Sequence, residues 1–321
     1  MTNKASMALQ TASWLTAEPQ DIEQKIERRV VGQLLQTLLY EEVIPFTIET
    51  HPNAPALFIM QGKSLQNESV EYRCYGYQST SFDLIRLDFN SLERIDQQAN
   101  KTTGSLYQLI DELLYEVKQS PHFAPFINEI EQTFIKDVQS RKQDYQPTLP
   151  SVELSPEALE QHFMDAHSYH PCYKSRIGFS LTENAQFGPE FAQPIQLIWL
   201  AVAKACSTFG ISEQYISKPH LFSQHLSSQH SPDDFLREEA GASNWQAWRQ
   251  QLTENNLNPD DFWFIPVHPW QWEHTIQSAL AQELITEDIV YLCGTQSQYT
   301  AQQSLRTLQN MTDVARPYVV F

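Results

Sequence analysis

Apolar residues recur every three or four positions in three stretches of the first half of the chain, which predicts three amphipathic helices. These helices are expected at residues 19–43, 106–117 and 126–138. Short runs rich in β-branched, aromatic and aliphatic residues separate the first helix from the second and predict strands. The strand-like runs are residues 56–60, 70–77 and 82–89. The front of the chain is therefore expected to form an α+β domain.

The pattern breaks between Ser140 and Pro156, where three prolines and little apolar periodicity are typical of an exposed linker. We therefore expect two domains, covering residues 1–147 and 148–321. The second domain alternates helix-like and strand-like stretches, which predicts a mixed α/β fold. Helices are expected at 156–166, 245–257 and 270–284, and strands at 195–202, 262–267, 289–293 and 317–321. The last strand runs to the final residue without a polar tail, so we expect this chain to be the front piece of a longer protein.

The charge of the chain disfavours several classes of protein. Its 321 residues include 39 acidic and 21 basic residues, a net charge of -18, which repels nucleic-acid backbones and anionic membrane surfaces. We therefore expect no nucleic-acid partner and no membrane partner. No run approaches the roughly 18 to 20 apolar residues of a spanning helix, and the start lacks a signal-peptide core, so we expect a cytoplasmic protein. The four cysteines lie far apart without a CxxC pair, which favours free thiols.

Basic residues are scarce after residue 142, with eight of them against 20 acidic residues, so their positions are informative. Half of these basic residues fall in two short stretches and are Lys174, Arg176, Arg306 and Arg316. In the first stretch, residues 167–179, two histidines precede the cations, and Pro171 and Gly178 indicate a shaped loop. Such a loop can direct an imidazole, an ammonium and a guanidinium at one phosphate or carboxylate group. The alternative is that Lys174 and Arg176 merely alternate outward from a strand.

Other stretches carry candidate chemistry of lower specificity. Ser304 and Arg306 would share one face of a predicted strand and form a second anion-binding surface, although an ordinary half-exposed strand has the same pattern. His268 lies at a strand-to-helix junction, where it could cap the helix or line a site. Zinc binding by His162, His167, His170 and Cys172 is a weak alternative, because the spacing matches no standard zinc motif. A buried thiol is the favoured interpretation of Cys172, ahead of a nucleophile.

Three motifs together resemble those of the NRPS-independent siderophore synthetases, also called the IucA/IucC family. HSYHPCYKSRIG at 167–178 is similar to the family motif GHPxHPxxKxRxG, and FIPVHPWQ at 264–271 is similar to its His-Pro-Trp-Gln motif. SLRT at 304–307 is similar to its S-x-R-T motif. Their order and approximate spacing also agree, and the resemblance covers at least residues 156–321.

The resemblance implies a cupped-hand fold, with a thumb-like α+β domain at 1–147 and a fingers-like, nucleotide-binding domain at 148–321. The C-terminal palm of the family is missing from this chain, so we expect the chain alone to be incomplete. The implied function is siderophore biosynthesis by an ATP-dependent acid-amine ligase. Such a ligase activates the carboxylate of citrate or a related polycarboxylate as an acyl-adenylate and passes it to an amine or hydroxyl. ATP and Mg²⁺ are the implied cofactors, and the resemblance is compatible with a homodimer.

Carried over by motif position, the resemblance implies catalytic roles for His170 and Arg306. The residues that it implies for nucleotide binding are His170, Lys174, Arg176, Ser304, Arg306 and Thr307. No residue is assigned as a metal ligand.

Several departures from the family pattern keep other functions open. Ala166 stands where the first motif begins with Gly, and Ser168 replaces a Pro. No lysine follows Lys218, although the family places one shortly after S-x-R-T. A non-catalytic truncated fragment or interaction module is therefore the main alternative, and a zinc-dependent hydrolase ranks below it.

Overall fold

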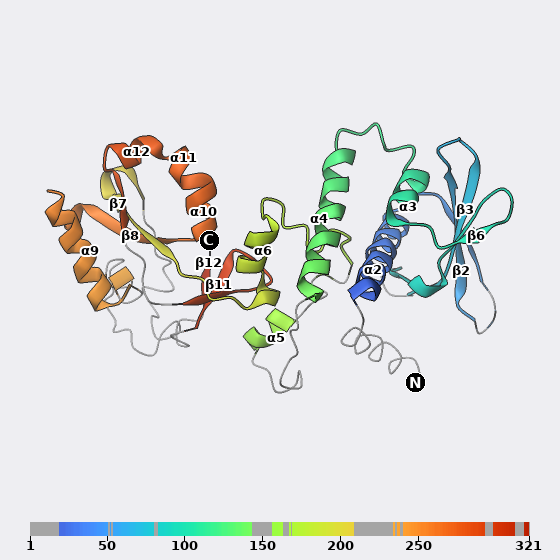
Figure 1. Ribbon diagram of the computed structural model, residues 1–321, viewed down its shortest axis with the longest axis horizontal. Helices are drawn as coiled ribbons and strands as arrows, with labels where there is room; N and C mark the ends of the chain where they lie inside the picture. Colours follow the sequence, from blue (N-terminus) through green and yellow to red (C-terminus); the bar gives the residue numbers. More distant parts are fainter. Residues whose placement is uncertain are drawn as a thin grey trace. The chain divides into compact units, whose positions relative to one another are not determined.

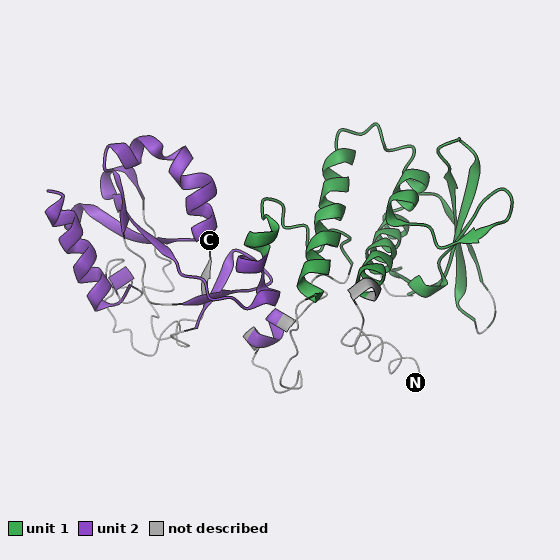
Figure 2. Ribbon diagram, in the orientation of Figure 1, with its two compact units in different colours: residues 1–153, 162–184 green, residues 154–161, 185–321 purple. Residues whose placement is uncertain are grey.

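The chain divides into two compact units. Figure 1 shows the computed structural model, which describes residues 19–50, 52, 54–79, 83–142, 156–162, 167, 169–208, 234, 236–237, 240–292, 298–311 and 318–320. Unit 1 comprises residues 1–153 and 162–184, and unit 2 comprises residues 154–161 and 185–321 (Figure 2). The division differs from a single cut between residues 147 and 148, because residues 162–184 pack with unit 1. The mixed α/β class expected from the sequence is confirmed.

Unit 1 combines helices with an antiparallel sheet of strand order β1-β2-β3-β5-β6, in which β4 also pairs with β3 (Figure 1). Its long helices are α2 (Pro19–Tyr40), α3 (Leu106–Leu113) and α4 (Phe123–Arg141). Its strands are β1 (Phe46–Glu49), β2 (Ala56–Lys63), β3 (Ser69–Gln78), β4 (Ile85–Leu87), β5 (Glu93–Ile95) and β6 (Lys101–Thr102), and the 3₁₀ turn η2 (Phe89–Ser91) follows β4.

One apolar core joins these helices to the sheet. Ile26, Val30 and Leu34 lie on one stripe of α2 and are fully buried, as their spacing of four residues predicts. Met60 of β2 pairs in register with Tyr72 of β3, and both side chains are fully buried. Burial of this apolar stripe is the main stabilising contribution to α2.

Unit 2 contains two small antiparallel sheets, with strand orders β8-β7-β9 and β10-β11-β12. Its strands are β7 (Ile198–Ala203), β8 (Phe262–Val267), β9 (Ile289–Leu292), β10 (Tyr299–Ala301), β11 (Thr307–Asn310) and β12 (Tyr318–Val320). The helical elements are α5 (Pro156–His162), η4 (Pro189–Phe191), η5 (Lys204–Cys206), α9 (Ala242–Glu254), η7 (Pro259–Asp261), α10 (Pro269–Gln271), the π-helical turn η8 (Trp272–Ile276), α11 (Gln277–Ala279) and α12 (Ala281–Ile285). The division between the units falls within α6 (Leu181–Phe187).

Aromatic side chains form the centre of unit 2. The rings of Trp199 on β7 and Trp248 on α9 lie 5.0 Å apart, and Phe264 on β8 meets Trp248 edge-on at 5.9 Å. All three side chains are almost completely buried. This cluster holds α9 against the β8-β7-β9 sheet, because large aromatic residues dominate the energetics of the cores that they fill.

The helices predicted in the first half and most of the predicted strands are confirmed, with shifts at their ends. The sequence missed β1, β5 and β6, which have 4, 3 and 2 residues and are too short to show an alternation. Ser140, which was assigned to the linker, lies in α4 and is buried. Residues 143–155 of that linker lie outside the described part of the chain. None of the helices among the described residues is long and apolar enough to cross a membrane.

Candidate functional site

The first motif forms a loop that is hydrogen-bonded to helices α2 and α4 of unit 1. We call its described residues, 167 and 169–180, the motif loop. They form turns and no strand, so the interpretation in which side chains alternate outward from a strand is wrong. From α2, Gln33 Nε2 donates to the His167 carbonyl at 3.1 Å and Thr37 Oγ1 donates to the Tyr169 carbonyl at 3.1 Å. These bonds satisfy backbone groups that have no ladder partner.

Lys174 of the motif loop is buried in an ion pair. Its Nζ atom lies 2.6 Å from Oδ1 of Asp137 and 2.9 Å from Oγ of Ser140, both on α4. Neither the Lys174 nor the Asp137 side chain is exposed to solvent. The nucleotide contact predicted for Lys174 would therefore require its ammonium to leave this pair. The sequence suggested that Lys174 is an exposed cation, but in the folded protein its buried ion pair with Asp137 anchors the loop.

Asp137 collects several more partners. Tyr173 donates its hydroxyl to Oδ2 at 2.6 Å, Arg141 lies 3.3 Å from Oδ1, and Arg29 lies 3.6 Å from Oδ2. Burial by itself would raise the pKa of Asp137, but the cations, Lys174 first among them, outweigh it and hold the pKa well below its usual range. We call Asp137 and these four partners the Asp137 cluster.

His170 is exposed, and hydrogen bonds to the backbone orient its ring. Its Nδ1 atom accepts from the Cys172 backbone N–H at 3.1 Å, and the backbone N–H of His170 donates to Nδ1 of His167 at 2.9 Å. Because Nδ1 accepts a hydrogen bond, the neutral ring carries its proton on Nε2. His170 thus presents a donor that suits a phosphate oxygen.

Cys172, next to His170, behaves as a buried thiol, as the sequence favoured. Its side chain is buried, and burial raises its pKa to about 12. The thiol therefore stays protonated at neutral pH, whereas a nucleophile requires the thiolate.

Arg176 adopts a left-handed backbone conformation, with φ at 38°. Its Nη1 atom donates to Oδ1 of Asn184 at 2.8 Å. Lys136 of α4 donates to the carbonyls of Ser175 and Arg176, at 2.7 Å each. The sequence interpretation missed both Lys136 and Asp137. The available signal was a charged residue on the apolar stripe of a predicted helix, since Asp137 follows Ile130 and Phe134 at helical spacing.

The second motif begins a helix in unit 2. His268 is the N-cap of α10, and its Nδ1 atom accepts from the Trp270 N–H at 3.1 Å, so the capping role is confirmed. The ring is buried and meets Phe187 edge-on at 4.9 Å. Burial lowers the pKa of His268 to about 4, and the ring is therefore neutral at physiological pH.

The third motif is the turn that joins β10 to β11, and not a continuous strand as the sequence predicted. The turn is closed by a 2.7 Å bond from the Thr307 N–H to the Ser304 carbonyl. Ser304 and Arg306 are exposed, Thr307 is half-buried at the start of β11, and Leu308 is fully buried. Among the residues that the structure describes, no side chain pairs with the Arg306 guanidinium.

The structure brings the predicted site residues together as two groups. His170, Lys174 and Arg176 share the motif loop of unit 1, whereas Ser304, Arg306 and Thr307 share the β10–β11 turn of unit 2. Each group has exposed or half-buried donors, and each can contact an anion.

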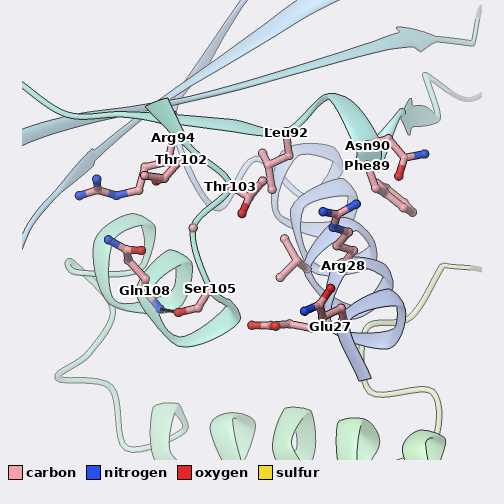
Figure 3. Close-up of a pocket in the computed structure, with 13 residues that line it drawn as sticks. Glu27, Arg28, Phe89, Asn90, Leu92, Arg94, Thr102, Thr103, Ser105 and Gln108 are labelled. Carbon is pink, nitrogen blue, oxygen red and sulfur yellow. Dashed lines mark hydrogen bonds between the residues drawn. The ribbon is translucent and has the colours of Figure 1, made fainter. Parts of the chain in front are cut away.

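A pocket of about 510 Å³ in unit 1 contains none of the motif residues (Figure 3). Two of its lining residues are arginines, Arg28 and Arg94. Arg94 already makes two hydrogen bonds of 2.7 Å to the buried carboxylate of Glu112, and the carboxylate of Glu27 also lines the pocket. This lining offers little excess positive charge, so the pocket is poorly suited to a triphosphate.

A metal centre is not evident in the described part of the chain. There, no group of three or more His, Cys, Asp or Glu side chains could hold a metal ion. The His162 side chain, one of the ligands weighed from the sequence, lies outside the described residues.

The part of the chain that carries the motifs matches a known family of proteins. Residues 155–319 match the family model described as IucA / IucC family, and the chain belongs to this family. It is 36% identical over 296 residues to the citryl-spermidine/3,4-dihydroxybenzoyl-citryl-spermidine:spermidine ligase of Bacillus anthracis. The match covers 92% of this chain and 45% of that ligase. The chain therefore spans about half the length of this curated relative.

Solved structures have a similar fold. The petrobactin biosynthesis protein AsbB from Bacillus anthracis gives a TM-score of 0.76 at 33% identity, over 95% of this chain and 47% of AsbB. Two aerobactin synthetases of Klebsiella pneumoniae, IucC and ATP-bound IucA, give TM-scores of 0.63 and 0.50 at 21% and 20% identity. They cover 91% and 87% of this chain, and 48% and 46% of their own chains. The motif loop and the β10–β11 turn thus lie in a fold of the siderophore synthetase type.

Replacing Asp137 with Asn tests the Asp137 cluster. The change leaves buried cations without their anion, so we expect the free energy of unfolding to fall by about 3–5 kcal/mol. Asp111→Asn is the matched control, because that carboxylate is 45% exposed and pairs with Lys118 on the surface, where a pair contributes about 0–1 kcal/mol. Urea titration followed by circular dichroism measures both variants. Equal losses in the two variants would contradict the central role of Asp137.

His268 predicts a pH dependence of stability. Between pH 6.5, the ordinary pKa of histidine, and the lowered value of about 4, the unfolded chain takes up a proton that the native ring does not. Stability is therefore lost as the pH falls, with a slope of up to about 1.4 kcal/mol per pH unit. His268→Asn keeps an N-cap acceptor and should show a shallower loss in urea titrations followed by tryptophan fluorescence. The exposed His122→Asn is the control, and a slope in His268→Asn equal to the native slope would refute the prediction.

Proposed function

We propose that this chain is the nucleotide-binding part of an ATP-dependent ligase of siderophore biosynthesis. The observation that carries the proposal is the match to the Bacillus anthracis spermidine ligase over 92% of the chain. The motif loop and the β10–β11 turn lie within residues 155–319, which match the family model, and they supply the donors that an anionic substrate requires. The resemblance of the motifs adds the finer assignment, in which residues 1–147 are thumb-like and residues 148–321 are fingers-like.

The reaction that we propose has two steps. A carboxylate oxygen of citrate or a related polycarboxylate attacks the α-phosphorus of ATP, and pyrophosphate leaves. The nitrogen of an amine, or the oxygen of a hydroxyl, then attacks the acyl carbon, AMP leaves, and the nucleophile loses its proton. Charge develops on the phosphate oxygens in the first step, so fixed hydrogen-bond donors accelerate it.

The described residues suit different parts of this chemistry. We assign the Nε2–H of His170 and the guanidinium of Arg306 to the phosphate oxygens of ATP, because both side chains are exposed. By the resemblance of their motifs, Arg176, Ser304 and Thr307 are further proposed donors to the nucleotide. Lys174 takes a different part: since its ammonium is buried on Asp137, we propose that it maintains the shape of the loop and does not bind the nucleotide directly.

Magnesium enters the proposal only as part of MgATP. Magnesium bound to nucleotide phosphates keeps several waters and needs only one or two protein carboxylates. The described residues contain no group of three or more His, Cys, Asp or Glu side chains that could hold a metal ion, so we assign the ion to the nucleotide.

Calorimetric titration of the purified protein with MgATP tests the proposal. We expect binding that weakens about tenfold or more in Arg306→Ala, since a hydrogen bond to a charged group contributes about 1.5–3 kcal/mol. Arg249→Ala, which removes an exposed guanidinium paired with Asp260, should leave the affinity unchanged. Absence of ATP binding would overturn the proposed function.

Exchange of labelled pyrophosphate into ATP separates a ligase from a binding module. Adenylation is reversible, so citrate-dependent exchange is expected from a protein that completes the first step. Binding of ATP without exchange at any citrate concentration would instead favour the interaction module, with nucleotide binding retained.

A further inference from the structure

Lys136 of α4 is a buried lysine with an unusual set of partners. Its side chain is 1% exposed, and its Nζ atom donates to two successive carbonyls of the motif loop, those of Ser175 and Arg176, at 2.7 Å each. A buried ammonium is ordinarily paired with a carboxylate. In the described part of the chain, no carboxylate forms a salt bridge with Lys136, so this charge serves the backbone of the loop.

The loop requires such support at Arg176. A left-handed backbone is uncommon for a residue with a large side chain, and Arg176 has a φ of 38°. The Ser175 carbonyl precedes the φ angle of Arg176, and the Arg176 carbonyl follows its ψ angle. Because one ammonium binds both carbonyls, it favours the turn. Burial, followed by the nearby Arg176, lowers the pKa of Lys136 to about 8 against an opposing effect of Glu183. The ammonium form therefore prevails at neutral pH.

A second residue of α4 acts on the side chain of Arg176. Nη1 of Arg176 donates to Oδ1 of Asn184 at 2.8 Å, and Nδ2 of Asn184 donates to Oε1 of Gln139 at 2.8 Å. Gln139 also donates to the Leu181 carbonyl at 2.8 Å. Lys136 and Gln139 are three residues apart and so lie on one face of α4. One helix face thus holds both the backbone and the guanidinium of Arg176.

We propose that Lys136 is a positioning residue that holds Arg176 in the conformation in which it binds the phosphates of ATP. The inference rests on the proposed function. It differs from the predicted site, because Lys136 lies outside all three motifs and acts only through the loop.

A double-mutant cycle with MgATP titration tests the proposal. Lys136→Met and Arg176→Gln are each expected to weaken ATP binding about tenfold, and the double variant should bind no more weakly than Arg176→Gln alone. Lys136→Gln, which keeps N–H donors, should be weakened less than Lys136→Met. Lys142→Met is the matched control, because this exposed lysine of the α4 C-cap pairs with Glu23 and should not affect binding.

Hydrogen exchange of the ligand-free protein provides a readout that does not depend on nucleotide. The amides of Ser175 and Phe179 donate to the carbonyls of Cys172 and Arg176 within the loop. In Lys136→Met, both should exchange faster than in the native protein, while the amides of α4 keep their protection. That retained protection shows that the variant is folded.

The outcomes distinguish this inference from the proposed function. Additive losses, or an unchanged affinity in Lys136→Met when Arg176→Gln binds weakly, would overturn the positioning role and leave the function intact. An unchanged affinity in Arg176→Gln would overturn both the role of Arg176 and this inference. Unchanged exchange at Ser175 and Phe179 would overturn the inference whatever the binding data show.

Discussion

The buried carboxylate of Asp137 is the constraint on which the described site of unit 1 depends. It lies on α4 and draws Lys174 and Tyr173 of the motif loop and Arg29 of α2 to one point. A charge with no solvent exposure is tolerated only when it is paired and hydrogen-bonded. If the loop left this position, these charges would either become exposed to solvent or remain buried without a partner. The buried Asp137 thus fixes the position of the motif loop and, with it, the position of the exposed donors that the loop carries.

This arrangement explains how an acidic chain can present a local candidate site for an anion. The net charge of -18 repels polyanions, so the cations that serve the proposed chemistry have to be held in place. Two lysines of unit 1 are used internally: Lys174 neutralises Asp137, and Lys136 holds backbone carbonyls. His170 and Arg176 are then left at or near the surface. In unit 2, Arg306 is exposed on the β10–β11 turn and, among the described residues, has no buried ion pair of its own. The turn is anchored by Leu308 of β11, which is fully buried.

Much of the fold was readable in the periodicity. The stripe of α2 and the apolar run of β8 were predicted because burial imposes their spacing. The short strands β1, β5 and β6 were not, since their pairing comes from neighbouring strands and not from their own residues. The candidate site shows the same division. His170 and Arg306 were identified by motif and are exposed, whereas the predicted strand geometry of Ser304 and Arg306 was wrong, because a turn and an alternating strand can share the pattern S-x-R.

The sequence by itself determined the family, the mixed α/β class and the residue types proposed to approach an anion, because motif spacing and hydrophobic period are local properties of the chain. Only the tertiary structure decided what each cation does. Lys174 and Asp137 are 37 residues apart, and Gln33 and His167 are 134 residues apart, and no local pattern records which buried group meets which. The pairing arises when α2, α4 and the motif loop pack together. For that reason Lys174, predicted as a ligand, is buried against Asp137, and Lys136, outside every motif, contacts the backbone of the motif loop.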